Sequence, residues 1–302
     1  MTEENFKKNV AIIGLGLLGA SFGMALRGGP YHRLGWNRRP EVNQWALDND
    51  IVDEAHDRVE DVIAKADITI LCLPIPMIKE YIVKYASCWR PGSVVTDIGS
   101  VKQVIVELGE KYLEPRGVFF VGSHPMAGTE KSGFEAAFPT LYDNAEAFVT
   151  RTDTTDPAAF NAVAGLWTCI GVKVVEIKPA DHDMLVAHTS HMLHVVASAL
   201  ARAVLDCPDA DEKQMRFSGC ATGFRDTSRI ASSSPRMWRE IIENNQDAAL
   251  SAIASFEKRL HRLRKIIENG EFDEFEQEFA QGKELRDSWV AYKAAKNRKP
   301  VK

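Results

Sequence analysis

Cysteine is scarce in this chain of 302 residues, and its placement argues against several classes of site. The five cysteines are odd in number, scattered, and form no Cys-x-x-Cys pair: Cys72, Cys88, Cys169, Cys207 and Cys220. A disulfide framework or a cysteine-rich zinc site needs regular paired spacings, so we expect neither. Unpaired thiols are typical of a reducing compartment, and we expect a cytoplasmic protein.

Long apolar runs and an excess of positive charge are also missing. No apolar run in the sequence reaches the length of a membrane span, and the first five residues lack the apolar centre of a signal peptide, so we expect no membrane. The formal net charge of -5 argues against general binding to nucleic acid. Hydrophobic residues make up 45% of the chain, which is typical of a globular protein, and the length suggests about two domains.

The first 177 residues alternate short apolar runs with segments of helical spacing. The runs that resemble buried strands are 9–13, 32–36, 68–73, 93–96, 118–121, 147–150 and 172–177. Buried strands that alternate with helices predict a doubly wound parallel α/β sheet of the Rossmann type. We therefore expect a dinucleotide-binding domain over residues 1–177.

The pattern changes near residue 178, beyond which strand-like alternation ends. Apolar residues at helical spacing predict helices over 181–205, 217–232, 235–244, 247–268 and 273–296, and hence an all-helical domain over 178–302. One stripe at this spacing is Leu250, Ile253, Phe256, Leu260, Leu263 and Ile267. Such a stripe either packs within the chain or covers a second copy in a two-fold dimer.

A glycine motif of the dinucleotide-binding type follows the first predicted strand. Gly14 permits a tight turn, Gly16 lets the backbone approach a pyrophosphate, and Gly19 allows a helix to pack closely on the strand. The start of that helix offers N–H groups and a positive dipole end to phosphates. The residues expected to bind the cofactor here are Gly14, Leu15, Gly16, Leu17, Leu18 and Gly19.

The end of the second predicted strand bears on the choice of cofactor. Sites specific for NAD usually have Asp or Glu there, whereas this chain has Asn37, Arg38 and Arg39. Two guanidinium groups suit a 2′-phosphate, so the sequence favours NADP over NAD. The alternative is that both arginines are surface charges before a helix that begins at Pro40.

Several motifs together resemble the prephenate/arogenate dehydrogenase family of tyrosine biosynthesis. The most specific is Ser-His-Pro-Met-Ala-Gly-Thr-Glu-Lys-Ser-Gly at 123–133. The others, in order with it, are 14–19, 97–102, 181–183, 190–194, 223–231 and 235–238. The resemblance implies a Rossmann-like domain followed by a helical domain that forms a homodimer. It also implies oxidative decarboxylation of prephenate or arogenate, with a hydride passing to NAD(P), and we lean towards prephenate.

The resemblance also implies roles for single residues. His124 would be the catalytic base for the substrate hydroxyl, and Ser100 would bond near that hydroxyl and His124, beside the nicotinamide. Arg229 would hold a substrate carboxylate, and His191 would be a second histidine of the pocket. Thr129, Glu130, Asp226 and Trp238 would shape or gate the pocket. Leu73, Pro74, Ile75 and Met77 follow a strand end and should lie along the cofactor.

Each of these residues has a plainer alternative, and the family has competitors. His124 could cap a loop, Arg229 could pair with Asp226 along a helix, and Trp238 could be core packing. The competing functions are a β-hydroxyacid-type dehydrogenase, which would need a lysine near the start of the helical domain, and a non-catalytic dimer that senses NADP. An acidic residue near the side-chain pocket, Asp226 or Glu130, would favour arogenate.

Two further expectations concern the helix after residue 181. His188, His191 and His194 step by three and drift across a helix face without a His-Glu-x-x-His motif, so we expect no metal. Many family members have Leu-Pro between the last two histidines, whereas this chain has Met192 and Leu193. Since proline disturbs a helix, we expect a more regular helix here.

Overall fold

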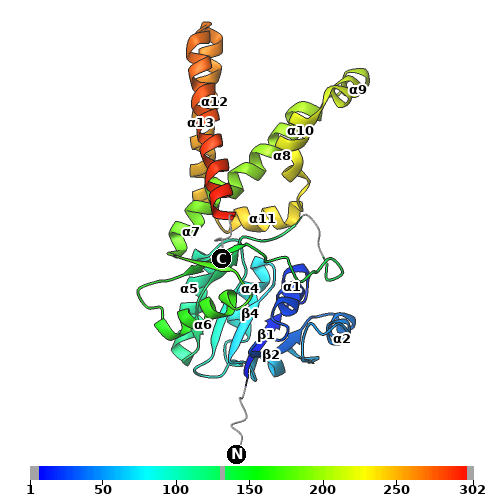
Figure 1. The fold of residues 1–302 in the computed structure, drawn as a ribbon, viewed down its shortest axis with the longest axis vertical. Coiled ribbons are helices and arrows are strands. Elements are labelled where there is room, and N and C mark those ends of the chain that lie inside the picture. The colour runs from blue at the N-terminus through cyan, green and yellow to red at the C-terminus, as the bar shows by residue number, and fades with distance from the viewer. Residues whose placement is uncertain (1–6, 130–132, 298–302) are drawn as a thin grey trace, which may run out of the picture. The chain divides into compact units, whose positions relative to one another are not determined.

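A computed structural model describes residues 7–129 and 133–297 of the chain (Figure 1). The chain divides after Gln246 into two compact units, which are described separately.

The first unit is built on a six-stranded sheet in which all neighbouring strands are parallel. The strand order is β3 (Glu54–Ala55), β2 (Tyr31–Trp36), β1 (Lys8–Ile13), β4 (Ile68–Leu71), β5 (Val94–Asp97) and β6 (Phe119–Phe120). Strands β4 and β5 are buried along their whole length, which is why both lack polar alternation. The prediction of a doubly wound parallel sheet is confirmed.

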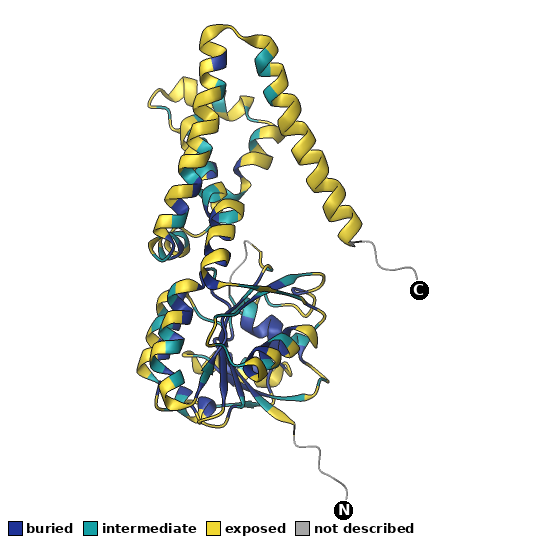
Figure 2. Ribbon diagram, turned by 90° about the vertical axis from the view of Figure 1, so that its left-hand side faces the viewer, coloured by how far each residue is buried: buried dark blue, intermediate teal, exposed yellow. Residues whose placement is uncertain are grey.

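Helices cover both faces of this sheet and create two apolar cores. They are α1 (Leu17–Ala25), α2 (Pro40–Asp48), α3 (Val59–Ile63), α4 (Ile75–Lys84), α5 (Gln103–Tyr112) and α6 (Pro157–Thr168). Successive side chains of a strand point to opposite faces, and accordingly Ile12 packs with Phe22 and Trp167 while Ile13 packs with Tyr81. Figure 2 shows the strands as the most deeply buried part of this unit.

A second, three-stranded sheet contains the histidine of the 123–133 motif. Its strands are β7 (Ser123–Pro125), β8 (Glu146–Thr150) and β9 (Lys173–Ile177), with β7 antiparallel and β9 parallel to β8. The expectation that all the apolar runs join one parallel sheet is therefore wrong for the last two runs. An apolar run reports burial and says nothing of strand partner or direction. His124 consequently lies on a strand, opposite Phe148 of β8.

The rest of the first unit is helical from Pro179 onwards. One continuous helical stretch comprises α7 (Pro179–Val186), a π-helical turn (Ala187–His191) and α8 (Met192–Leu205). It is followed by α9 (Ala210–Gly219), α10 (Thr222–Ser228), a 3-10 turn (Arg229–Ser232) and α11 (Pro235–Glu243). The predicted helix over 217–232 is wrong, because the chain is extended at Cys220 and Ala221 and two helices meet there.

The stretch Pro179–Leu205 bears on the expectation that the chain has no membrane span. By length and composition alone, this 27-residue helix could cross a membrane, and 22% of its most apolar segment is buried in the single chain. The expectation of no such span rested on uninterrupted apolar runs, whereas the apolar residues of this helix are interspersed with polar ones. The same stretch contains His182 and Asp183, which are buried. The stretch Pro179–Leu205 therefore carries both apolar residues and buried polar side chains.

The second unit consists of α12 (Gln246–Asn269) and α13 (Phe272–Asn297). Gly270, with a φ of 72°, makes the turn between them, and Arg262 pairs with Glu274 at 2.7 Å and Glu278 at 2.8 Å. Leu250, Leu260 and Ile267 of the predicted stripe remain 56%, 55% and 54% exposed. The domain boundary at residue 178 remains a prediction: strands give way to helices there, whereas the compact units divide at 246.

Candidate active site

Four loops of the predicted site leave the same edge of the parallel sheet. Ile13 at the end of β1 is level with Trp36 of β2 and Leu71 of β4, and Leu71 is level with Asp97 of β5. The segments that follow these strands, which begin at residues 14, 37, 72 and 98, therefore start side by side. Ligands of open α/β sheets bind at this carboxyl edge, where the strand order reverses next to β1.

The glycine loop has the backbone geometry that a dinucleotide requires. Gly14 has a φ of 99°, and a Cβ there would lie 2.4 Å from the Cys72 carbonyl oxygen. A Cβ on Gly19 would lie 2.0 Å from the Gly14 oxygen, so both positions demand glycine for packing. A Cβ on Gly16 would meet nothing within 4 Å, so the loop faces open space at the start of α1. These features fit the phosphates of a dinucleotide.

The predicted cofactor residues divide into two groups by burial. Leu15 is 0% and Ile75 is 5% exposed, and their side chains belong to the two cores. Leu17, Leu18, Leu73 and Met77 are half-buried, and Pro74 is exposed at the start of α4. Leu15 and Ile75 can therefore offer a ligand their backbone only.

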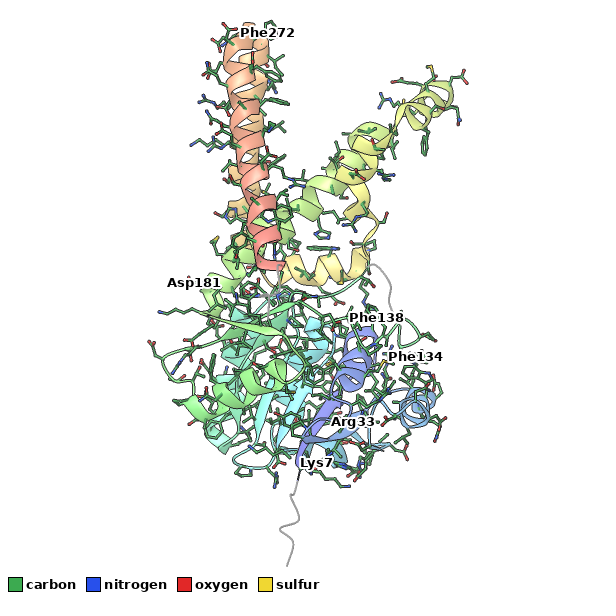
Figure 3. All side chains as sticks on the ribbon, viewed as in Figure 1. Lys7, Arg33, Phe134, Phe138, Asp181 and Phe272 are labelled. Atoms are coloured by element: carbon green, nitrogen blue, oxygen red, sulfur yellow. The ribbon has the colours of Figure 1, made fainter. Side chains whose placement is uncertain are left out.

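The turn after β2 holds its two arginines differently. Asn37 accepts a bond from the Arg39 N–H at 3.0 Å, and its own N–H donates to Asn43 at 2.7 Å. The Arg39 guanidinium lies 5.2 Å over the Phe134 ring, which in turn packs against Trp45. Figure 3 shows Phe134 and Phe138 on the side of the unit that bears α1 and α2. Both arginines are exposed.

His124 is held by a second histidine from the helical segment. Its Nδ1 lies 2.9 Å from Nε2 of His182, and Nδ1 of His182 lies 2.8 Å from Oδ1 of Asp183. The Asp183 carboxylate also accepts the backbone N–H groups of Lys102 at 2.7 Å and Gln103 at 2.9 Å, at the start of α5. His182 is 0% and Asp183 is 5% exposed, whereas His124 is half-buried.

A buried ion pair between Lys102 and Asp97 adjoins these hydrogen bonds. The Lys102 ammonium donates to Oδ2 of Asp97, and both residues are fully buried. Asp97 also accepts N–H groups of Gly99 at 2.8 Å and Ser123 at 3.2 Å. The Ser123 hydroxyl donates back to the Asp97 carbonyl at 2.6 Å. The end of β5, which leads to Ser100, is thereby fixed to the strand that bears His124.

Further side chains of the predicted pocket form a group around Trp238. The His191 ring is buried, lies 3.2 Å from the Asn245 amide through Nδ1, and meets the edge of Trp238. The His194 ring stacks on Trp238 with centroids 3.7 Å apart. Among the described residues, the Trp238 Nε1 is the buried side-chain polar atom that lacks a hydrogen-bond partner. Such a donor commonly faces a ligand or water.

The expectation of a regular helix at these histidines is wrong. Ala187–His191 form a π-helical turn immediately before Met192, although no proline is present. A π-helical turn contains more residues than an α-helical one and changes the direction of the side chains that follow. It brings His191 to the buried side, where Asn245 contacts it.

Burial lowers the pKa of His124, His182, His191 and His194. Desolvation is the main cause for His124, whose pKa falls well below the usual value, and the nearby His182, Lys102 and His191 act in the same direction. Burial likewise lowers the pKa of His182, against the opposing effect of its hydrogen bond to the Asp183 carboxylate. The pKa of His191 falls to about 4 through burial. These imidazoles are therefore neutral near pH 7.

The remaining predicted residues lie apart from this group or outside the described residues. Asp226 is exposed and pairs with Arg225 at 2.9 Å, so the predicted alternative of an Asp226–Arg229 pair is not what the structure has. Arg229 is exposed and lies close enough to His194 to lower its pKa, after burial and against the Ser190 carbonyl. Thr129 is exposed, and Glu130 lies outside the described residues.

Residues that the sequence analysis did not place in the site also take part. His182, Asp183 and Asn245 connect His124 to His191 through hydrogen bonds, and Asn245 donates to the Asp183 carbonyl at 2.8 Å. The signal for the first two was present in the matched segment 181–183, but no role was assigned to it. Within the described ranges, no set of three His, Cys, Asp or Glu side chains converges in a way that would hold a metal.

Comparisons with known proteins agree across both halves of the chain. Residues 23–176 match the family model described as "Prephenate dehydrogenase, nucleotide-binding domain", and residues 178–281 match "Prephenate dehydrogenase, dimerization domain". A prephenate dehydrogenase of Bacillus subtilis is 31% identical over 287 residues, which cover 94% of this chain and 76% of that protein.

Solved structures of two relatives share the fold. Prephenate dehydrogenase from Aquifex aeolicus, in complex with hydroxyphenyl propionate and NAD+, superposes with a TM-score of 0.85 at 34% identity, covering 93% of this chain and 98% of that one. Synechocystis arogenate dehydrogenase gives a TM-score of 0.83 at 31% identity, covering 93% and 99%.

Proposed function

The chain belongs to the prephenate dehydrogenase family, and we propose that it catalyses the oxidative decarboxylation of prephenate, arogenate or both with NAD(P). The observation that supports this most directly is the position of His124 beside the cofactor edge of the sheet. The neutral, half-buried His124 directly follows Ser123, which bonds to Asp97 at the carboxyl end of β5, and the open glycine loop follows β1 at the same edge.

The residues of this site can perform the proton chemistry that the reaction needs. A nicotinamide held at the glycine loop would supply the acceptor for the hydride of the carbinol carbon. His124 takes the hydroxyl proton as that carbon becomes a carbonyl, and Ser100 orients the hydroxyl. The ring carboxylate then departs as carbon dioxide, the electron pair of the broken C–C bond makes the ring aromatic, and the imidazolium returns its proton to the ring oxygen. Aromatisation drives the reaction, so the protein mainly positions the reactants.

Arg229 and Trp238 are the groups suited to the carboxylates of the substrate. Arg229 is exposed, it makes no ion pair within the described part of the chain, and a guanidinium binds a carboxylate in a bidentate manner. The unpartnered Nε1 of Trp238 offers a second donor. Asp226 is occupied by Arg225, so it is a weak candidate for the ammonium group of arogenate, and we lean towards prephenate.

A four-way assay tests the proposed function. Prephenate and arogenate are each supplied with NAD and with NADP, and formation of the reduced nicotinamide is followed. We expect turnover with prephenate, faster with NADP. Absence of turnover in all four reactions, from folded protein that binds NADP, would contradict the proposal and favour a sensor of the cofactor.

We propose NADP as the preferred cofactor on the basis of the turn after β2. An Asp or Glu would repel a 2′-phosphate, but the turn has Asn37 followed by two exposed arginines. The contact of Arg39 with Phe134 holds one guanidinium close to the turn. Glu41 lies 3.9 Å from Arg39, too far to neutralise it fully in solvent.

Replacement of both arginines should separate the two cofactors. In Arg38→Ala/Arg39→Ala we expect the KM for NADP to rise by about 10–100-fold, since two charge-assisted contacts are lost, and the KM for NAD to change by less than about threefold. Arg58→Ala, another exposed arginine in an ion pair, serves as the matched control. Equal effects on both cofactors would show that the two arginines are only surface charges.

We also propose that the active form is a homodimer through the C-terminal helices. The match of residues 178–281 to a dimerization domain supports this, as do the exposed apolar side chains on α8 and, separately, on α12. A molar mass of one chain by light scattering at assay concentration would contradict it.

A further inference from the structure

Within the described residues, the row Asp183–His182–His124 engages one nitrogen of His124, Nδ1. Nδ1 of His124 is engaged by His182, so Nε2 is the nitrogen that can face a substrate. A general base must present an unprotonated nitrogen, but a neutral imidazole can carry its proton on either one. Whether His124 can act as a base therefore depends on which tautomer its neighbours select.

The hydrogen bonds of Asp183 decide the tautomer of His182. Oδ1 of Asp183 already accepts the Lys102 N–H at 2.7 Å, and Oδ2 accepts that of Gln103 at 2.9 Å. Both donors are backbone amides at the start of α5, where the positive end of the helix favours an anion. The carboxylate thus acts as an acceptor, and Nδ1 of His182, 2.8 Å away, must donate to it.

The tautomer of His182 then decides that of His124. Burial lowers the pKa of both rings, so each carries a single proton near pH 7. Because the proton of His182 is on Nδ1, its Nε2 has only a lone pair to offer. The bond of 2.9 Å between the rings therefore requires Nδ1 of His124 to donate. Nε2 of His124 is left with its lone pair.

We infer that His182 and Asp183 are positioning residues, which fix His124 in the tautomer with a proton on Nδ1 so that Nε2 is free to accept the substrate hydroxyl proton. This inference rests on the proposed function. When the hydroxyl proton moves to Nε2, the imidazolium keeps its Nδ1–H bond to His182, and no further proton transfer is needed. The arrangement resembles in principle the carboxylate that orients histidine in serine proteases, with a second imidazole in between.

The groups around the two rings are consistent with His124 donating to His182 and His182 donating to Asp183. His124 faces His182 from α7, Lys102 from the start of α5 and His191 from the π-helical turn. The charges of Lys102, Asp183 and Asp97 act on His182, whose ring makes an edge-type contact with that of Phe148 at 5.7 Å between centroids. The ammonium of Lys102 is engaged by Asp97, and Nδ1 of His191 by Asn245. Within the described residues, Asp183 is accordingly the carboxylate that bonds directly to one of the two rings, that of His182.

The first test measures the tautomer itself in the full-length protein. Uniform labelling of histidine with ¹⁵N distinguishes a protonated from an unprotonated ring nitrogen by chemical shift, and the His124 signals are assigned by their loss in His124→Asn. We expect Nδ1 of His124 to be protonated and Nε2 unprotonated at pH 7. A proton on Nε2 in the wild-type protein would overturn the inference, whatever the outcome of the substrate assay.

The second test reverses the direction of the hydrogen bonds that join His124, His182 and residue 183. In Asp183→Asn, an amide N–H directed at His182 would convert Nδ1 to an acceptor, move its proton to Nε2, and thereby move the His124 proton to Nε2. We expect the NMR signature of the other tautomer and a fall in kcat of about 10²–10⁴-fold, with unchanged affinity for NADP. A lowered kcat without a change of tautomer would overturn the inference. Asp181→Asn, exposed on the same helix, is the matched control.

A pair of variants at His182 keeps the inference testable if Asp183→Asn does not fold. His182→Leu removes the acceptor, whereas His182→Gln retains an amide oxygen that can accept the Nδ1–H of His124. We expect the glutamine variant to keep a kcat about tenfold higher than the leucine variant. Equal kcat values in the two variants would mean that His182 only fills space. His188→Leu, exposed on the same stretch, is the control.

Discussion

His124→Asn is expected to lower kcat by about 10²–10⁴-fold, the usual contribution of a general base, while the affinity for NADP stays within about twofold. The asparagine amide can occupy the position of Nδ1 and keep a hydrogen bond to His182, so strands β7 and β8 should remain paired. What the variant lacks is a group that accepts the hydroxyl proton. An asparagine variant with near wild-type kcat would remove His124 from the proton transfer.

The pH dependence of the wild-type enzyme provides an independent check on the same residue. Burial lowers the pKa of His124 well below its usual value, and the neighbouring His182, Lys102 and His191 lower it further. The base is active when neutral, so kcat/KM should fall only as the pH drops below about 6.5, the ordinary value. An acid limb that already begins above pH 7 would contradict a depressed pKa. His124→Asn should lack this limb.

The central sheet was predictable because its strands other than β3 each leave a local trace. Ile68–Leu71 and Val94–Asp97 are buried on both faces, and only a parallel sheet covered by helices explains such runs at this spacing. The two-residue strand β3 was not predictable, since Glu54 and Ala55 are too few to show a period. The pairing of β8 with β7 was also beyond the sequence, because apolar alternation does not encode the partner.

In the site, too, features set by a local motif were predictable, whereas contacts between residues far apart in the sequence were not. The motif assigned Gly14 a tight turn and Gly19 close packing, and the structure gives Gly14 a φ of 99° and Gly19 the close contacts that packing requires. The bond of His124 to His182 joins residues 58 positions apart, and neither flanking segment predicts it. A histidine on an apolar helix is more often a core residue than a partner of a catalytic group. His182 is both buried and engaged, which only the tertiary structure reveals.

The prediction with the largest expected effect on stability concerns the ion pair beneath the site. In Lys102→Met, the Asp97 carboxylate stays buried among the N–H groups of Gly99 and Ser123 but loses its cation. Breaking one side of a buried pair typically costs about 3–5 kcal/mol, and we expect the free energy of unfolding to fall by that amount. Urea unfolding of the variant and the wild type measures the difference. A loss below about 1 kcal/mol would mean that the pair contributes little.

A second substitution and a change of pH distinguish the lost charge from a simple packing defect. Asp97→Asn added to Lys102→Met removes the buried charge and keeps an oxygen for the backbone donors, so it should recover a large part of the loss. Burial raises the pKa of Asp97, and Lys102 is the main opposing influence. Without Lys102 the folded state binds a proton more tightly than the unfolded state, so the deficit of Lys102→Met should shrink as the pH falls from 8 to 5. A deficit independent of pH, and not relieved by Asp97→Asn, would instead indicate that the lysine stem acts by packing alone. Asp97 also accepts the N–H of Ser123, the residue before His124. Lys102→Met should therefore also make the position of the His124 ring less well defined.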